Sequence, residues 1–336
     1  MRGLMKMAGS MALLALLGSV PATAQTQAPA PQPAFPTLPT FAEEPVGDQF
    51  PGAFFAKPEG AGPHPVMVVL GGSEGNDFSA RWFTPLFLKQ GYAVLGLPYY
   101  APVWGAQQSR FPTLPANFVD IPVERAGQAR EWLCARDDVR CDRIGLYGVS
   151  KGAEYALLAG SLEKDSAGFA AIAAIVPTDV VWEGWGMGVP FGQRSSFSWR
   201  GRPLPFVPYI GMAEEFAKFA TAPATVRLRV PHDRGRHANP DRAIAARIKV
   251  EAIKAPVLVA GGDADNTWNS GEMAQAIAER RAEVGLETTA LIYTDSGHGL
   301  AGDGANPNGW YSDKDVAAQK EIWPATLAFF AKHLKK

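Results

Sequence analysis

Short runs of consecutive apolar residues recur along the chain from about residue 65 onward. A run without alternation between apolar and polar positions is typical of a strand that is buried on both faces of a sheet. These runs are rich in Val, Ile, Leu and Ala. We therefore predict strands at residues 66–70, 93–97, 144–149, 169–175, 257–260 and 288–293.

Between these runs the apolar positions take the spacing of amphipathic helices, at residues 81–90, 123–135, 152–162, 270–284 and 313–334. Strands that alternate with helices in this way predict an α/β fold, in which a mostly parallel, doubly wound sheet is covered by helices on both faces. No internal repeat is visible.

The alternation breaks once, between the fourth and fifth predicted strands, over about residues 178–250. This stretch is rich in Trp, Gly, Pro and Arg, and we interpret it as a lid inserted over the carboxyl edge of the sheet. Its aromatic residues could line an apolar binding pocket or simply pack, and its arginines could hold an anion or form a solvated loop. The residues concerned are Trp182, Trp185, Trp199, Arg227, Arg229, Arg234 and Arg236.

The first residues resemble an export signal. A basic start precedes an apolar run at residues 11–20 and a small-residue site at Ala22, Thr23 and Ala24. The run is shorter than the roughly 20 residues that span a bilayer, so no stable membrane insertion is expected. We predict a signal peptide at residues 1–24 cleaved after Ala24, a proline-rich arm at 25–50, and a single α/β domain at 51–336 in a periplasmic or secreted protein.

Charge and cysteine content fit an exported protein. The formal net charge is −1, and removal of the basic signal makes the chain more acidic, which argues against nucleic acid as a partner. The only two cysteines, Cys134 and Cys141, are close in sequence. An oxidising compartment favours a disulfide between them, although two buried free thiols are the alternative.

The sequence LYGVSKGAEYAL places a G-x-S-x-G pattern between a predicted strand and a predicted helix. That context is the one required of a nucleophile elbow, which presents a serine on a sharp turn. Ser150 is the predicted nucleophile. The backbone N–H of Lys151, at the helix start, is a predicted donor to the oxyanion, while its side chain could form a local ion pair with Glu154.

A serine hydroxyl needs a base and an orienting carboxylate to act as a nucleophile. In chains with a nucleophile elbow, the acid follows the serine in the sequence and the histidine follows the acid. Of the five histidines, His298 alone follows the last predicted strand, and we predict it as the base. For the acid, the segment GGDAD offers Asp263 and Asp265 after a strand end, and Asp265 is preferred because it lies farther into the turn. Such a site needs no metal or organic cofactor.

A second oxyanion donor is expected in the loop LGGSEGNDF after the first predicted strand, because this fold supplies one there. Gly72 is the predicted donor and Ser73 is its rival.

Taken together, the segments LGGSEG, YGVSKGAEYAL, GRPLPFVPY, IKVEAIKAPVLVAGGDADNTWNS and SGHGL resemble the C-terminal domain of the acyl-CoA thioesterase and bile acid-CoA:amino acid N-acyltransferase family. The likeness runs from about residue 60 to the end, with a broader kinship to dienelactone hydrolase-like enzymes. It implies an α/β-hydrolase fold with Ser150, Asp265 and His298 as the triad.

The family resemblance also bears on the reaction. Transferase members have Cys at the nucleophile position, so Ser150 favours hydrolysis of a small-molecule ester or thioester. The alternatives are acyl transfer or peptide cleavage on the same triad, or a non-catalytic exported binding protein with this fold. The oligomeric state is not predicted.

Overall fold

The computed structural model describes residues 38–102, 111–163, 168–307 and 309–335. They belong to one compact unit that begins at Leu38. The predicted signal peptide and residues 25–37 of the predicted arm lie outside the described residues. The rest of the arm belongs to the compact unit, and part of it forms a strand.

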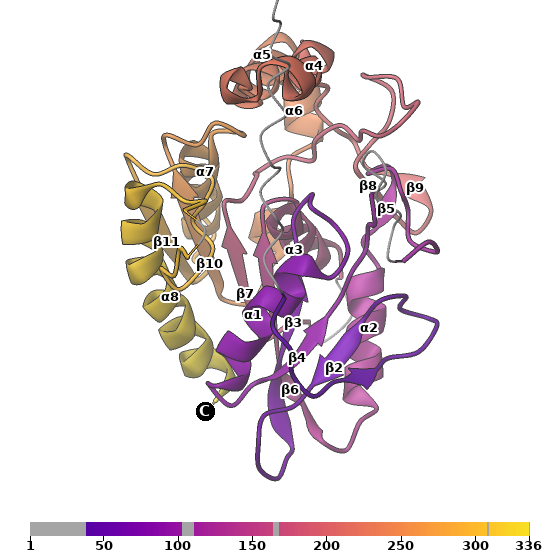
Figure 1. Ribbon diagram of the computed structural model, residues 1–336, viewed down its shortest axis with the longest axis vertical. Coiled ribbons are helices and arrows are strands. Elements are labelled where there is room, and N and C mark those ends of the chain that lie inside the picture. Colours follow the sequence, from indigo (N-terminus) through magenta and orange to yellow (C-terminus); the bar gives the residue numbers. More distant parts are fainter. Residues whose placement is uncertain (1–37, 103–110, 164–167, 308, 336) are drawn as a thin grey trace, which may run out of the picture. The chain divides into compact units, whose positions relative to one another are not determined.

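A mostly parallel sheet forms the centre of the fold, as predicted (Figure 1). Near one edge, β2 pairs antiparallel with both β1 and β4, and all other neighbouring strands of this sheet are parallel. In spatial order the strands are β1 (Glu44–Pro45), β2 (Phe54–Ala56), β4 (Ala93–Gly96), β3 (His64–Leu70), β6 (Val139–Val149), β7 (Ala171–Ile175), β10 (Val257–Gly262) and β11 (Thr288–Tyr293).

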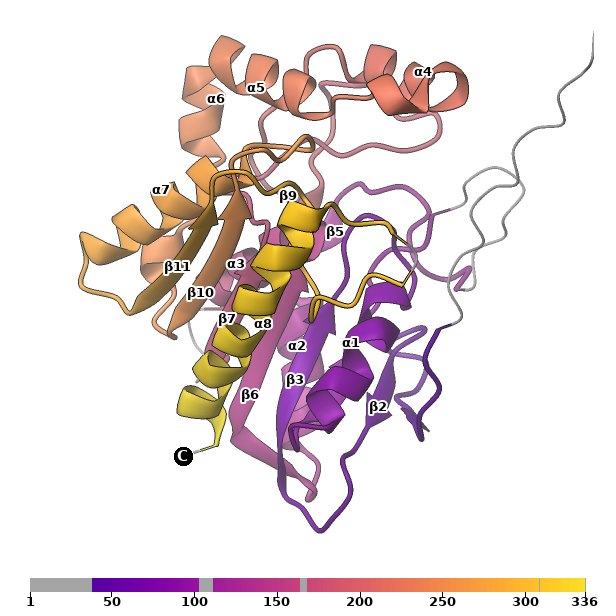
Figure 2. The ribbon, with the colours of Figure 1, turned by 60° about the vertical axis from the view of Figure 1, so that its left-hand side comes forward.

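Helices cover both faces of the sheet (Figure 2). Helices α2 (Arg125–Cys134), α3 (Lys151–Leu162) and α7 (Ser270–Ala282) bury their apolar residues in one core cluster, and α1 (Phe78–Leu88) and α8 (Asp313–Leu334) bury theirs in the other. Within the described part of the chain, no helix is both long enough and apolar enough to cross a bilayer.

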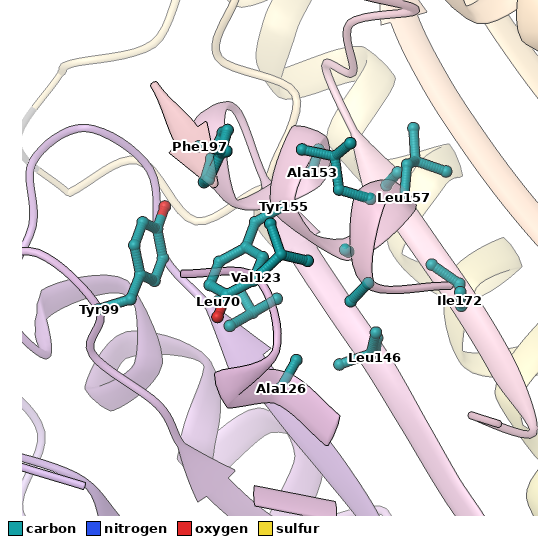
Figure 3. Packing of buried hydrophobic residues seen from close by; sticks show 14 of the residues in the cluster. Leu70, Tyr99, Val123, Ala126, Leu146, Ala153, Tyr155, Leu157, Ile172 and Phe197 are labelled. Carbon is teal, nitrogen blue, oxygen red and sulfur yellow. The ribbon is translucent and has the colours of Figure 1, made fainter. Parts of the chain in front are cut away.

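The strands are continuously apolar because successive side chains point to opposite faces and both faces are covered. In β3, Val66, Val68 and Leu70 enter the first cluster, whereas Met67 and Val69 enter the second. Figure 3 shows the first cluster, in which side chains of the strands meet those of α2 and α3; the labelled residues include Leu70, Leu146, Ile172, Ala126, Ala153 and Leu157.

The stretch between β7 and β10 does not continue the alternation of strands and helices, in agreement with the predicted break. It contributes the short strands β8 (Phe197–Trp199) and β9 (Arg202–Pro203), which form a separate sheet with β5 (Ile121–Pro122). Its helices α4 (Met212–Thr221), α5 (Arg229–Ala238) and α6 (Pro240–Ala245) lie beyond the ends to which the parallel strands point (Figures 1 and 2). The stretch also contains the short 3₁₀ helices η1 (Pro223–Thr225) and η2 (Val250–Ala252), of which η2 packs against α3 and α7.

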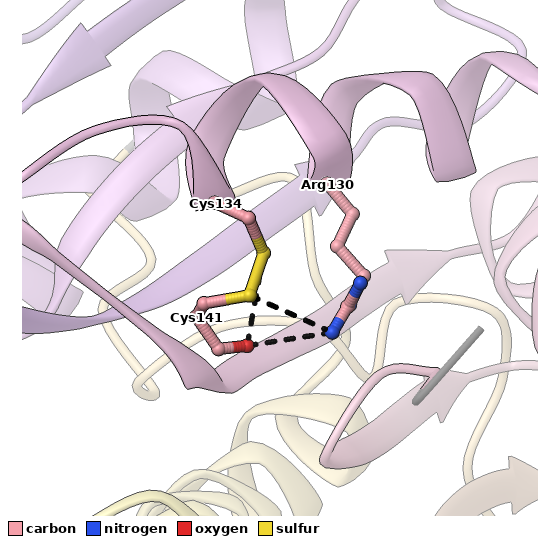
Figure 4. Close-up of a disulfide and its surroundings, with 3 residues drawn as sticks. All are labelled: Arg130, Cys134 and Cys141. Atoms are coloured by element: carbon pink, nitrogen blue, oxygen red, sulfur yellow. Dashed lines mark hydrogen bonds between the residues drawn. A yellow bond between two sulfur atoms is a disulfide. The ribbon is translucent and has the colours of Figure 1, made fainter.

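A disulfide joins Cys134, the last residue of α2, to Cys141 near the start of β6 (Figure 4). The guanidinium of Arg130 lies beside it, with Nη2 3.5 Å from the Cys141 carbonyl oxygen. The bond lies near the start of the strand whose other end leads to Ser150.

Candidate active site

Ser150 occupies the sharp turn between β6 and α3. Its φ of 57° lies in the left-handed region, which residues other than glycine rarely adopt. The backbone N–H of Ser150 donates to the Ile175 carbonyl oxygen at 2.9 Å, so the turn is fastened to the neighbouring strand. Strained backbone held in place by its surroundings is typical of functional sites.

The two glycines of the G-x-S-x-G pattern are required by close backbone contacts. A Cβ added to Gly152 would lie 2.3 Å from the Leu70 and Gly71 carbonyl oxygens, and one added to Gly148 would lie 2.2 Å from the Gly152 carbonyl oxygen. Neither position has room for a side chain. The pattern is therefore part of the packing between β6, α3 and the loop after β3.

The structure brings Ser150, His298 and Asp265 into one hydrogen-bonded row. His298 Nε2 lies 2.9 Å from Ser150 Oγ, and Nδ1 lies 2.7 Å from Asp265 Oδ2. An ionised carboxylate only accepts hydrogen bonds, so Nδ1–H donates to Asp265 and Nε2 is left to accept from the Ser150 hydroxyl. This arrangement can remove the proton from Ser150.

Asp265 is fully buried, and its carboxylate is held from several sides. Ser270 Oγ donates to Oδ2 at 2.7 Å, and the Thr267 N–H donates to Oδ1 at 2.8 Å. Burial alone would raise the pKa of Asp265, but the charge of His298 and these hydrogen bonds outweigh it, and the pKa is lowered. Asp265 is therefore ionised where it faces His298.

Asp263, the other candidate acid, has a different place. It is exposed, and its carboxylate lies against the first turn of α7, where a Cβ on Gly271 would be 2.0 Å from Oδ1. An acidic group there is stabilised by the helix dipole. Of the two candidates, Asp265 contacts His298.

Two aromatic residues behind His298 were not singled out as site residues from the sequence. The Trp268 ring meets the His298 ring edge-on, with centroids 4.8 Å apart, and its Nε1–H donates to the Pro177 carbonyl oxygen at 3.1 Å. His232 packs against Trp268 and is buried, which lowers the pKa of His232 to about 3, so its imidazole is neutral. Trp268 belongs to the segment GGDADNTWNS, which carries part of the family resemblance, and this was its sequence signal, whereas nothing in the sequence sets His232 apart from core packing.

The predicted oxyanion donor Gly72 has an acceptor that was not foreseen. Its N–H donates to Glu74 Oε1 at 3.0 Å, so in this structure it is not available to an oxyanion. The loop turns back on itself and brings the Glu74 carboxyl over Gly72. The rival residue, Ser73, lines the wall of an apolar pocket that lies next to Ser150, His298 and Asp265. A charged residue inside the glycine-rich LGGSEG was the available sequence signal for Glu74.

Lys151 begins α3, so its backbone N–H is among those at the helix start that have no partner within the helix. Its side chain is buried, with Nζ 2.6 Å from Glu154 Oε2 and 3.0 Å from Ser196 Oγ. The predicted local pair with Glu154 is present, but it is buried instead of exposed. Burial lowers the pKa of Lys151, and the negative charge of Glu154 opposes that effect. Three aromatic rings surround the ammonium group.

A pocket of about 650 Å³ lies beside the row formed by Ser150, His298 and Asp265, and its wall is mainly apolar. Trp268 connects the two, because it lines the pocket and contacts His298. The wall is formed by Ser73, Glu74, Lys151, Trp185, Tyr209, Met212, Phe216, Phe219, Leu228, His232, Thr267 and Trp268. In the part of the chain that the structure describes, no cluster of His, Cys, Asp or Glu is placed to hold a metal ion.

The insertion's aromatic residues divide between the two predicted uses. Trp185 lines the pocket, whereas Trp182 is fully buried and stacks on Tyr209. Trp199 lies in β8.

Two of the insertion's arginines, Arg229 and Arg236, bind groups of the protein itself. Arg236 forms a two-pronged pair with Asp179, at 2.6 and 2.7 Å. Arg229 Nη1 donates to the Asp263 carbonyl oxygen at 2.7 Å and to that of Asp265 at 3.4 Å, so the insertion holds the acid loop.

Comparison with known proteins adds a family. The family described as BAAT / Acyl-CoA thioester hydrolase C terminal matches residues 121–302. The chain is 25% identical to acyl-coenzyme A thioesterase 6 of Mus musculus over 293 residues, covering 82% of this chain and 62% of that protein. It is also 25% identical to acyl-coenzyme A thioesterase 1 of Homo sapiens over 298 residues, covering 84% and 63%. The chain thus spans about six tenths of the length of these relatives.

Solved structures confirm the predicted α/β-hydrolase fold. A putative dienelactone hydrolase from Klebsiella pneumoniae superposes with a TM-score of 0.51 at 15% identity, covering 83% of this chain and 92% of the other. An alpha/beta hydrolase from a Medee basin deep-sea metagenome library gives 0.53 at 12% identity, covering 88% and 98%. At these identities the likeness concerns the fold alone.

Proposed function

The chain belongs to the BAAT / acyl-CoA thioester hydrolase C-terminal family, and from this premise we propose that it is an exported serine hydrolase that cleaves carboxylic esters or thioesters. The observation that carries the proposal is the continuous row of hydrogen bonds from Ser150 through His298 to Asp265. A base within 2.9 Å of a serine hydroxyl, oriented in turn by a buried carboxylate, is the arrangement that activates a serine nucleophile.

The reaction proceeds through an acyl-enzyme. Ser150 Oγ attacks the acyl carbonyl while its proton passes to His298 Nε2, and Asp265 stabilises the imidazolium that forms. The oxyanion lies at the start of α3, where the Lys151 N–H and the positive end of the helix dipole stabilise it. Protonation of the leaving group by His298 releases it, and water activated by the same imidazole then hydrolyses the acyl-enzyme.

The apolar pocket accommodates the acyl group. Its aromatic and aliphatic wall favours a sizeable apolar acyl chain over acetate, since burial of apolar surface contributes roughly 25 cal/mol per Å². The curated relatives are named as acyl-coenzyme A thioesterases, which makes acyl thioesters one substrate class. Coenzyme A is an intracellular carrier, so an exported enzyme is expected to act on other esters or thioesters.

Export and a lid belong to the same proposal. Residues 1–24 are the signal peptide, and the mature chain begins after Ala24. An oxidising compartment is consistent with a disulfide between Cys134 and Cys141. Residues of about 178–250 act as the lid, and the wall residues Tyr209, Met212 and Phe216 within this stretch support that role.

The test combines active-site labelling with turnover. The mature protein and Ser150→Ala are treated with a fluorophosphonate probe and assayed with p-nitrophenyl esters and acyl-CoA thioesters of increasing acyl length. We expect labelling and turnover in the wild type and their loss, by about 10⁶-fold in kcat, in Ser150→Ala. The preferred series distinguishes an esterase from a thioesterase.

Two further measurements separate the alternatives. New esters or amides formed with added alcohols or amines would indicate an acyltransferase, and cleavage of acyl-peptides would indicate a peptidase. A folded wild-type protein that is neither labelled nor active would contradict the catalytic proposal and favour a binding protein.

A further inference from the structure

Glu74 lies beside the nucleophile and has no role in the mechanism above. It follows β3 in the loop that packs against the elbow, and its side chain is exposed and lines the pocket. A Cβ placed on Gly72 would be 2.7 Å from Glu74 Oε2 and 3.1 Å from Ser150 Cβ. The carboxyl and the nucleophile therefore flank the same backbone position.

The two carboxyl oxygens of Glu74 differ in their hydrogen bonds. Oε1 accepts from the Gly72 N–H and from the Ser79 hydroxyl. In the part of the chain that the structure describes, the hydrogen bonds that other residues donate to this carboxyl both go to Oε1 and none goes to Oε2. A carboxyl group whose one oxygen accepts two bonds is suited to carry its proton on the other oxygen, which here is the one near Gly72 and Ser150.

The charge state of Glu74 matters because negative charge develops on the substrate oxygen during attack. An ionised carboxylate close to that oxygen would repel it, whereas a neutral acid can donate a hydrogen bond to it. Although the Glu74 side chain reaches the open side of the pocket, the protein atoms packed around its carboxyl group desolvate it, and this is the largest influence, which raises the pKa of Glu74. Hydrogen bonds from the Ser79 hydroxyl and from the N–H groups of Glu74 itself and of Gly72, together with the charge of His298, act in the opposite direction. An apolar acyl group in the pocket displaces water and favours the neutral form further.

The other titratable groups around Glu74 come from each element packed against it. They are Lys151 of α3, which lines the same pocket; His298 after β11; Tyr99 after β4, whose hydroxyl donates to the Gly71 carbonyl oxygen at 2.5 Å; and Tyr311 before α8. Burial, followed by the charge of Glu74, raises the pKa of both Tyr99 and Tyr311, so both are neutral phenols that neither add to nor compensate the charge of Glu74. Lys151 is already paired with Glu154.

We propose that Glu74 is a second oxyanion donor, a neutral carboxylic acid whose Oε2–H donates to the substrate oxygen as Ser150 attacks. This inference rests on the proposed function. The new bond joins Ser150 Oγ to the acyl carbon, the carbonyl π electrons move to oxygen, and the hydroxyl proton passes to His298 Nε2. Glu74 keeps its own proton throughout, so it takes the place that the sequence assigned to the Gly72 N–H.

The experiment compares Glu74→Gln with Glu74→Ala in the full mature chain. The glutamine retains an acceptor for Gly72 and Ser79 and a neutral N–H donor that cannot ionise, whereas alanine removes the donor. We expect kcat for a p-nitrophenyl ester to fall about 100-fold in Glu74→Ala and to stay within about tenfold in Glu74→Gln. A trifluoromethyl ketone, which forms an oxyanion adduct with the serine, should bind more than about tenfold more weakly to Glu74→Ala only.

The pH profile gives a reading that a purely structural role would not change. Wild-type kcat should decline as pH rises through the raised pKa of Glu74, because the donor is lost on ionisation. Glu74→Gln should lose that decline. Asp295→Asn is the matched control, since it makes the same change in an exposed carboxylate of the loop before His298, paired with Lys314.

The outcomes separate this inference from the proposed function. A wild type without Ser150-dependent turnover contradicts both. Ser150-dependent turnover with an unchanged pH profile in Glu74→Gln, or with undiminished kcat in Glu74→Ala, overturns the Glu74 role alone. A rise in kcat in Glu74→Ala would identify the carboxyl as a plug over Gly72 and would also overturn it. Thermal unfolding of each variant verifies that it is folded.

Discussion

At the scale of single residues, two aspartates that are two positions apart in the sequence meet different surroundings. Asp265 is fully buried and bonded to His298, Ser270 and the Thr267 N–H, while Asp263 is exposed at the start of α7. Loss of charge at Asp265 would leave the His298 imidazole without its acceptor. The same loss at Asp263 would weaken only a favourable contact with a helix terminus, worth about 0.3–1 kcal/mol.

The substitution Asp265→Asn should therefore lower kcat by about 10⁴-fold, because an amide can donate to Nδ1 and stabilise the wrong imidazole tautomer. Asp263→Asn is the matched control and should change kcat by less than about threefold. Steady-state kinetics on the preferred ester, with thermal unfolding of both variants, measures the difference. Equal losses in the two variants would contradict the assignment.

The same residues show what the sequence could and could not predict. Ser150 and His298 were identifiable because one lies in a glycine-bounded turn and the other follows the last strand. Asp265 could only be preferred over Asp263, since the choice depends on which carboxylate the loop turns inward. Glu74 was missed because its local signal, a charged residue within LGGSEG, does not show how closely its loop approaches the elbow.

At the scale of elements, the strands and covering helices were predicted where burial on two faces leaves a strong apolar pattern. The edge strands β1 and β2 were not, because they are very short and β1 contains a proline within the predicted arm. Helix α5 has the sequence RVPHDRGRHA, and its proline and glycine have low helix propensity. Because packing stabilises this helix, its sequence alone did not predict it. The break between β7 and β10 could be predicted, but the elements within it could not.

Helix α4 offers a prediction about specificity. Phe216 lines the pocket and packs near Phe191 and Phe219, with centroids 6.0 and 6.2 Å away. Phe216→Ala should raise KM for long-chain esters about tenfold, equivalent to about 1.4 kcal/mol, with kcat retained, because apolar contact is lost without change to the reacting groups.

The matched control for Phe216 is Glu214→Gln, an exposed position on the same helix. Kinetics over acetate, butyrate and longer esters should show the effect growing with chain length in Phe216→Ala and absent in Glu214→Gln. An equal change for acetate and for long esters would show that α4 does not contact the acyl chain.

At the scale of the whole molecule, the disulfide and the reacting serine lie toward opposite ends of the same strand. Cys141 lies near the start of β6, and Ser150 follows its last residue. A cross-link between residues seven positions apart restricts the unfolded chain modestly, with an expected contribution of about 2 kcal/mol. The disulfide should stabilise the fold without affecting the chemistry.

Replacement of both cysteines by serine should therefore lower the free energy of unfolding by about 2 kcal/mol and leave fluorophosphonate labelling of Ser150 intact. Urea denaturation of the mature protein measures the change, and reduction of the wild type with dithiothreitol should reproduce it. The double variant, which has no bond to reduce, serves as the control. A wild type whose stability is insensitive to the reductant would contradict the expectation.

The origin of the pocket wall has a consequence for how such an enzyme diversifies. About half of the wall comes from residues 209–232, while the reacting side chains come from three separate places outside that stretch. Mutations that accumulate in residues 209–232 can therefore change which substrates bind, while Ser150, His298 and Asp265 stay as they are. Arg229 is one exception, because it also holds the acid loop, so its substitution is expected to lower activity as well as change binding.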